Sequence, residues 1–160
     1  MENSQTCACG GCGTIAPNKS TTIQKQPLPK DGRYIHIEWK HLAKDGETCV
    51  RCGKTGENLK QIIAELESEL KPQGVKIDFL ETKLEPSQIH ESNSILINGT
   101  PLETLLPQAQ VEENECKSCS CLVEKYASCR AIKYNNKLYE DIPAKLIKQA
   151  IYNRLNGTSK

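Results

Sequence analysis

The sequence predicts an α/β domain, because two strand-like stretches enclose one helical stretch. Residues 34–39 alternate, with β-branched and aromatic side chains prominent, and residues 75–80 alternate in the same way. Between them, residues 57–70 repeat apolar side chains at helical spacing. The apolar stripe of this helix consists of Leu59, Ile62, Ile63, Leu66 and Leu70. A strand, a crossover helix and a strand of this length predict a βαβ unit with parallel strands.

The ends of this helix are marked by glycine and proline. Gly53 and Gly56 lie early in the segment, so we expect the helix to begin after residue 52, with Thr55 or Gly56 as its cap. Pro72 and Gly74 are expected to end it.

The second half of the chain predicts further strands and a last helix. Residues 94–97 form a third strand that stops at a turn, Asn98-Gly99. Residues 101–106 fit either a short edge strand or a helical turn. Residues 131–140 predict a hairpin around Asn135-Asn136, since asparagine tolerates positive φ.

The final helix is expected to begin near Pro143 and to stop at Gly157. Its apolar stripe consists of Leu146, Ile147, Ala150, Ile151 and Leu155.

Composition narrows the class of protein. The 160 residues carry 21 Lys and Arg against 20 Asp and Glu, and no basic stripe with interleaved aromatics is present, which argues against a nucleic-acid partner. No apolar run is long enough to cross a bilayer, so no membrane partner is expected. The start lacks the apolar region of a secretory signal, which predicts a cytoplasmic protein. In a reducing cytosol, nine cysteines indicate metal binding or redox chemistry more than a disulfide scaffold.

The first 30 residues read as a disordered, cysteine-rich tail and linker, followed by a domain at 31–157. The tail is polar, contains several prolines and shows no apolar period, so it cannot bury enough surface to fold alone. Cys7, Cys9 and Cys12 lie among glycines, an arrangement that suits capture of a soft ion but also fits an incidental set of thiols.

Cys49 and Cys52 form a CxxC motif between the first strand and the helix. This position indicates a redox-active pair held at the rim of the sheet; structural zinc ligands are the alternative. Lowering a thiol pKa from ~8.5 to ~7 takes roughly 2 kcal/mol. A helix N-terminus supplies about 0.3–1 kcal/mol, so a cation such as Arg51 or Lys54, or a second thiol, must contribute.

A second cluster combines Cys116, Cys119, Cys121 and Cys129. Four thiolates are a complete tetrahedral set for Zn²⁺, and closely spaced thiolates also suit trivalent arsenic or mercury. Two further uses stay open: a disulfide relay with the CxxC pair, and a purely structural zinc that holds a loop without an apolar core.

Several motifs together resemble an uncharacterised thioredoxin-like family, known as a domain of unknown function. The resemblance covers residues 34–155, and the residues that carry it are Trp39, Cys49-Val50-Arg51-Cys52, Ser92-Asn93-Ser94-Ile95-Leu96-Ile97-Asn98-Gly99, Cys129-Arg130 and Leu138-Tyr139-x-x-Ile142-Pro143. It implies a thioredoxin-like fold, in which a central mixed sheet of four to five strands is flanked by helices and carries a cysteine-rich insertion.

The resemblance also implies roles for the CxxC pair. Cys49 would be the attacking thiol and Cys52 the resolving one. Thioredoxin-like oxidoreductases usually place a cis-proline before the third strand, facing the CxxC, where it also keeps metals away. Here that position is Asn93 or Ser94, and no proline stands near. Metal binding at the pair therefore stays open.

Two functional hypotheses follow from these residues. The first is thiol–disulfide exchange through Cys49 and Cys52, which requires a protein or small-molecule thiol or disulfide as partner. The second is a protein that binds or handles a soft metal or metalloid, Zn, Hg or As, through clustered cysteines without turnover. No histidine is assigned as a ligand, and Glu38 is expected to face solvent.

Overall fold

The computed structural model describes residues 34–157, and its first part is a βαβ unit. Strand β1 (Tyr34–Lys44) runs into helix α1 (Val50–Leu70), which returns the chain to strand β3 (Lys76–Leu84). The two strands pair in parallel, with Tyr34 opposite Lys76 at one end and Leu42 opposite Leu84 at the other. The predicted parallel pair and its crossover helix are therefore confirmed. The expected tail of residues 1–30, with Cys7, Cys9 and Cys12, lies outside the described residues.

The sheet is completed by antiparallel strands. Strand β4 (Ser94–Ile97) pairs with β1 on the side opposite β3, and β5 (Thr100–Pro101) pairs with β4. The short β2 (Glu47–Thr48) folds back on the end of β1. The sheet has five strands and is mixed, as predicted. Segment 101–106, which fitted two alternatives, contains the end of β5 and then the short helix α2 (Leu102–Leu105).

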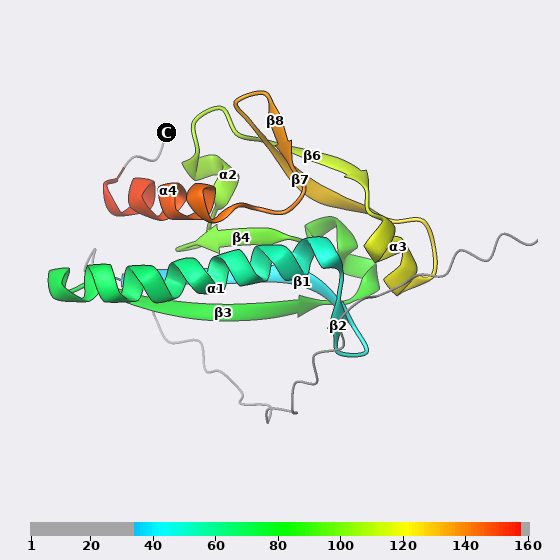
Figure 1. Cartoon of the computed structure of the whole chain (residues 1–160), viewed down its shortest axis with the longest axis horizontal. Helices are drawn as coiled ribbons and strands as arrows, with labels where there is room; N and C mark the ends of the chain where they lie inside the picture. Colours follow the sequence, from blue (N-terminus) through cyan, green and yellow to red (C-terminus); the bar gives the residue numbers. More distant parts are fainter. Residues whose placement is uncertain (1–33, 158–160) are drawn as a thin grey trace, which may run out of the picture.

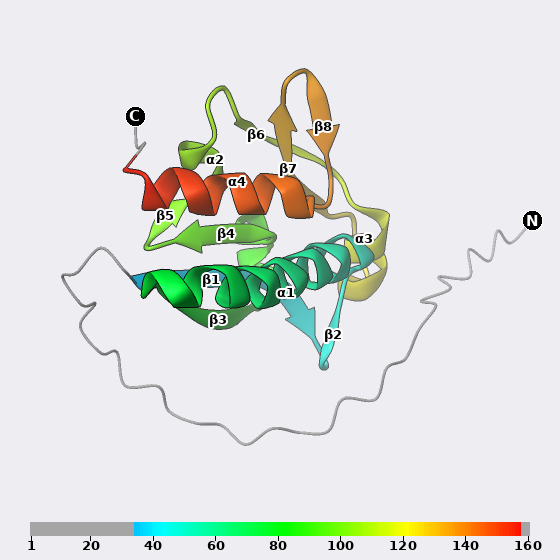
Figure 2. The ribbon, with the colours of Figure 1, turned by 60° about the vertical axis from the view of Figure 1, so that its left-hand side comes forward.

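The helices α1 and α4 (Ala144–Leu155) lie side by side on the same face of this sheet (Figures 1 and 2). On β1, Ile35, Ile37 and Trp39 are buried, whereas the residues between them are only partly buried. The core lies between this face and the two helices. Two short helical segments connect these elements: η1 (Lys71–Gln73) lies between α1 and β3, and η2 (Pro86–Glu91) lies between β3 and β4.

A second sheet carries the cysteine-rich insertion. Strands β6 (Gln110–Glu115), β7 (Ser128–Tyr134) and β8 (Lys137–Tyr139) pair antiparallel in that order, and helix α3 (Lys117–Val123) connects β6 to β7. The turn between β7 and β8 places Asn135 and Asn136 at φ 51° and 60°. The predicted hairpin is confirmed, because asparagine accepts this left-handed conformation.

Helix α1 begins earlier than the sequence predicted. Its N-cap is Cys49, not Thr55 or Gly56. Glycine costs up to about 1 kcal/mol inside a helix, but Gly56 is needed where it stands: a Cβ there would lie 2.4 Å from the ring of Trp39. The Thr55 hydroxyl does not cap the helix; it accepts hydrogen bonds from the Ile142 N–H (3.0 Å) and the Asn93 side-chain amide (3.1 Å). Tertiary packing therefore overrides the local glycine signal.

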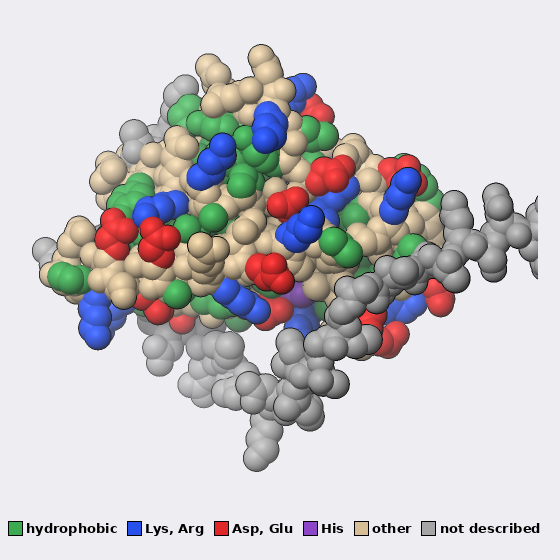
Figure 3. Space-filling view, viewed as in Figure 1, with side chains coloured by type: hydrophobic (Ala, Val, Ile, Leu, Met, Phe, Trp, Pro, Cys, Tyr) green, Lys and Arg blue, Asp and Glu red, His purple; other side chains and the backbone are tan. Residues whose placement is uncertain are grey.

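The surface is mixed in charge on the face that Figure 3 shows, where Lys and Arg side chains alternate with Asp and Glu. Within residues 34–157, no helix is both long and apolar enough to cross a membrane.

Candidate metal centre

The CxxC pair lies at the start of α1, nearer to the helix than the sequence predicted, and it is not accessible. Cys49 caps α1 in an extended conformation, and its Sγ accepts a hydrogen bond from the Cys52 backbone N–H at 3.4 Å. Only 3% of Cys49 and none of Cys52 is exposed to solvent. The expectation of two thiols at an open rim was wrong, because the β6–α3–β7 insertion also contributes buried residues to the core cluster that contains this end of the helix.

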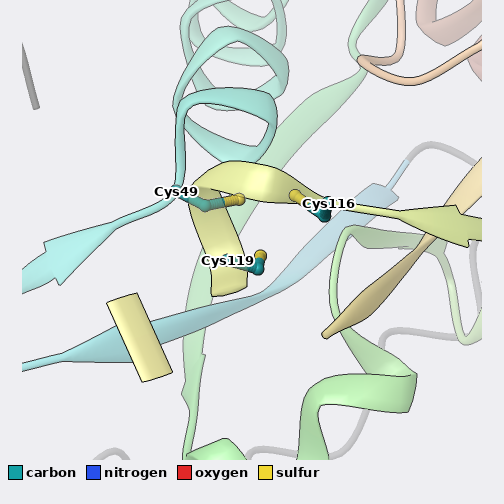
Figure 4. Close-up of side chains that lie close together, drawn as sticks. All are labelled: Cys49, Cys116 and Cys119. Carbon is teal, nitrogen blue, oxygen red and sulfur yellow. The ribbon is translucent and has the colours of Figure 1, made fainter. Parts of the chain in front are cut away.

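The insertion brings further sulfurs to Cys49. Cys116 is the N-cap of α3, and Cys119 lies in the first turns of the same helix. The Sγ atoms of Cys49, Cys116 and Cys119 all lie within 4.8 Å of one another, and all three residues are buried. Figure 4 shows the three side chains converging from the start of α1 and from α3. We call these three residues the three-sulfur group.

Two further cysteines of the predicted cluster lie differently. Cys129, on β7, is fully buried, and its Sγ lies 2.9 Å from the Sγ of Cys119. Cys121 is partly buried in α3 and does not belong to the three-sulfur group. The sequence placed Cys49 and the second cluster in separate sites; the structure joins Cys49 to Cys116 and Cys119.

The thiols divide into acceptors and donors of hydrogen bonds. The pKa of Cys49 is lowered because Cys116, and then Cys119, Cys129 and Cys52, donate to its thiolate. Donation from Cys119 and Cys129 lowers the pKa of Cys116 to about 6. The pKa values of Cys119 and Cys129 are raised, in both cases mainly by the interaction with Cys116. The pKa is therefore lowered at Cys49 and Cys116 and raised at Cys119 and Cys129.

Cys52 faces the opposite side of the pair, toward the segment before β4. Its Sγ lies 3.4 Å from the Ser92 hydroxyl, which also accepts a hydrogen bond from the Leu42 N–H at 3.0 Å. The pKa of Cys52 is raised, first by its interaction with Cys49 and then by burial. Ser92 stands in a motif that carried the resemblance, but the sequence did not predict its contact with Cys52. It directly precedes Asn93, one of the two positions at which the resemblance implied a proline.

Next to it, Asn93 supports the same region through its backbone and side chain. It adopts φ 67°, and its amide donates to Thr55 and to the Glu140 carbonyl. Its Oδ1 accepts from the Trp39 indole at 3.5 Å. This buried network fixes the segment that contacts Cys52.

Arg51, expected to act on the thiols as a cation, instead ties α1 to the insertion. Its guanidinium donates to Asn114 Oδ1 at 2.7 Å and to the Glu115 carbonyl at 3.1 Å, and it pairs with Glu140 at 3.1 Å. Because Glu115 directly precedes Cys116, these bonds help to place Cys116 opposite Cys49. Lys54 is exposed.

The histidines and Glu38 do not join the three-sulfur group. His41 is buried, stacks on Trp39 with ring centroids 3.9 Å apart, and its Nε2 lies 2.8 Å from Glu81. Glu38 is partly buried and accepts a hydrogen bond from Thr82.

A family model described as "Domain of unknown function (DUF2703)" matches residues 35–151. The chain belongs to this family. This confirms the part of the resemblance that concerned a domain of unknown function, whereas the thioredoxin-like relationship stays a prediction. Among curated proteins, the DUF2703 chain is 36% identical over 117 residues to an uncharacterized protein of Archaeoglobus fulgidus, covering 71% of this chain and 82% of the relative. No solved structure matches it.

Proposed function

We propose that this DUF2703 protein binds one thiophilic metal or metalloid ion through Cys49, Cys116 and Cys119, without turnover. The observation that carries the proposal is the convergence of three buried sulfurs, from the start of α1 and from α3, within 4.8 Å of one another. Soft ions prefer thiolate ligands. Free cysteines are also common as ordinary core residues; what distinguishes these three is that their sulfurs are close enough together to be ligands of one ion.

The spacing suits a shared ion. Two sulfurs on one tetrahedral zinc ion are ~3.8 Å apart, given a Zn–S bond of about 2.3 Å. The limit of 4.8 Å for the three-sulfur group therefore requires little movement of the side chains. The lowered pKa values of Cys49 and Cys116 favour the thiolate form that a metal needs.

Burial favours an ion over a macromolecular substrate. A disulfide substrate must bring its own sulfur into line with the attacking thiolate, but Cys49 is only 3% exposed and Cys116 only 2%. A single ion needs much less room. A reducing compartment such as the cytoplasm would keep these thiols available.

Metal titration of the reduced full-length chain tests the proposal. Cys7, Cys9 and Cys12 are changed to serine in the parent protein and in every variant, so that the absorption comes only from thiols of residues 34–157. Addition of Cd²⁺ is followed by the ultraviolet sulfur-to-cadmium charge-transfer absorption. We expect one equivalent of Cd²⁺ to bind, and we expect C49S and C116S to abolish stoichiometric binding.

C52S is the matched control, because Cys52 is equally buried and belongs to the same CxxC but lies outside the three-sulfur group. It should bind one equivalent. Equal binding by C49S and the parent protein would refute the proposal, as would a folded, fully reduced protein that binds no Cd²⁺.

Thiol–disulfide exchange by Cys49 and Cys52, with a protein or small-molecule thiol or disulfide as partner, is the second candidate. It is favoured by one observation: Cys49 caps α1, and its pKa is lowered. The reduction rate of a small disulfide substrate decides this candidate. If C49S reduces the substrate as fast as the parent protein, the pair is not a catalyst of exchange.

A further inference from the structure

The three-sulfur group has little around it to balance negative charge. The Cys52 backbone N–H donates to Cys49 Sγ, and the Ser118 hydroxyl lies 3.4 Å from Cys116 Sγ. Arg51, the guanidinium nearest in sequence, directs its bonds to Asn114, Glu115 and Glu140. Among residues 34–157 no Lys or Arg side chain hydrogen-bonds to a sulfur of the group. The described residues therefore supply no hydrogen-bonded cation that would balance a charged complex at these sulfurs.

The charge of the bound complex separates the possible ions. Three thiolates with a divalent ion leave a net charge of −1, and four thiolates with a divalent ion leave −2. Three thiolates with a trivalent ion leave none. Burial of an unpaired charge is costly, and all three cysteines are buried. The site should therefore favour a trivalent ion over zinc or cadmium.

The number of close sulfurs points the same way. Trivalent arsenic and antimony form three bonds in a pyramid, and softness directs them to thiolates. Cys129, which would be the fourth ligand of a tetrahedral site, lies 2.9 Å from Cys119. Cys129 does not belong to the group of sulfurs that all lie within 4.8 Å of one another, so three sulfurs are gathered and not the four of a tetrahedral zinc site.

We propose that the three-sulfur group is a site for a trivalent metalloid, As(III) or Sb(III), held as a neutral tris-thiolate by Cys49, Cys116 and Cys119. This rests on the proposed function and names its ligand class. Arsenous acid, As(OH)₃, supplies the ion. Three As–S bonds form and three As–O bonds break; each hydroxide leaves with one thiol proton as water. Arsenic stays trivalent, so no oxidant or reductant takes part. Cys129 remains a thiol beside Cys119.

Arsenite titration of the full-length chain tests this inference. The protein carries serine at positions 7, 9 and 12 and is reduced with a phosphine, because dithiol reductants bind arsenite themselves. Native mass spectrometry counts bound arsenic, and alkylation followed by peptide mapping identifies the protected thiols. We expect one arsenic per chain and protection of Cys49, Cys116 and Cys119.

Single cysteine variants distinguish the thiols that bind arsenite from those that do not. C49S, C116S and C119S should each weaken arsenite binding by about 100-fold or more, the scale on which an additional intramolecular attachment raises affinity. C52S and C129S should bind like the parent. Arsenite should also displace Cd²⁺ from the loaded protein.

The failures of the two proposals differ. If Cd²⁺ binds and protects Cys129 together with the three-sulfur group, while arsenite neither binds nor displaces it, the metalloid inference is wrong and the proposed function stands. The metalloid inference is also wrong if C129S weakens arsenite binding as strongly as C119S. If neither ion binds to the reduced protein, both proposals are wrong.

Discussion

Helices α1 and α3 begin in the same way but are held in place differently. Each is capped by a cysteine, Cys49 or Cys116, that starts a CxxC sequence. Helix α1 has 21 residues, and its buried set includes the whole predicted apolar stripe. Helix α3 has 7 residues, and its only buried residue is Cys119.

A helix that starts with a CxxC sequence can therefore be held in place by two different kinds of packing. A helix of two turns is unstable alone, and tertiary packing must hold it. For α1 that packing comes from leucine and isoleucine against the sheet. For α3 it comes from the buried thiol of Cys119, which faces other thiols, and from Leu122 and Val123, which are only partly buried against the core. We therefore expect the α3 half of the site to depend more on sulfur contacts than the α1 half.

Leu66→Ala should have the largest effect on the free energy of unfolding. It tests the claim that α1 is held by its packing in the hydrophobic core. Leu66 is fully buried in α1. Loss of a buried leucine side chain costs about 2–5 kcal/mol, so the free energy of unfolding should fall by that amount with a clear drop in melting temperature. Urea unfolding followed by circular dichroism measures it. A loss below ~1 kcal/mol would contradict the comparison.

Gly56→Ala should have the next largest effect, since a Cβ there would lie 2.4 Å from the Trp39 ring. Overpacking of this kind costs about 1–3 kcal/mol. Gly53→Ala is the matched control in the same helix, because the nearest atom to its added Cβ is 3.9 Å away. Alanine should stabilise that position by up to roughly 1 kcal/mol. Unfolding curves that move both variants in the same direction would show that the contact with Trp39 does not govern this helix.

Loading the site should have the smallest global effect and a clear local one. Amide hydrogen exchange of the metal-free and Cd²⁺-loaded protein should differ in α3 and little in α1, because α1 buries a full apolar stripe whereas the one buried side chain of α3 is a thiol. C119A should remove this difference while lowering global stability by only about 1 kcal/mol, as expected for loss of one small buried group. Equal protection of α3 in both states would show that α3 is held by other contacts.

The body of the fold could be predicted from local pattern. The parallel pair β1 and β3 and the hairpin around Asn135-Asn136 all carry a period or a turn signal. The start of α1 could not be predicted, because Gly53 and Gly56 both disfavour a helix locally. The need for Gly56 becomes clear only when the ring of Trp39 is placed against the helix. Helix α3 was also missed, since its residues show no apolar period.

The candidate site was only partly predictable for a related reason. The spacing of Cys49 and Cys52, and that of Cys116 and Cys119, singled out these thiols as candidates for redox chemistry or metal binding. Spacing along the chain cannot show that two distant motifs meet, and the contact between Cys49 and the insertion depends on long-range bonds such as those of Arg51. The burial of the pair followed from the same contact, so an accessible rim was predicted where the insertion in fact closes over the sulfurs.

The position of Cys49 has one more consequence. Its sulfur neighbours Cys52 on one side and Cys116 with Cys119 on the other, and a single atom cannot serve a disulfide bond and an ion at once. A disulfide between Cys49 and Cys52 would remove one of the three proposed ligands of the ion. An ion bound to Cys49 would in turn protect that thiol from oxidation. The two chemistries that the sequence suggests would thus exclude each other in one molecule.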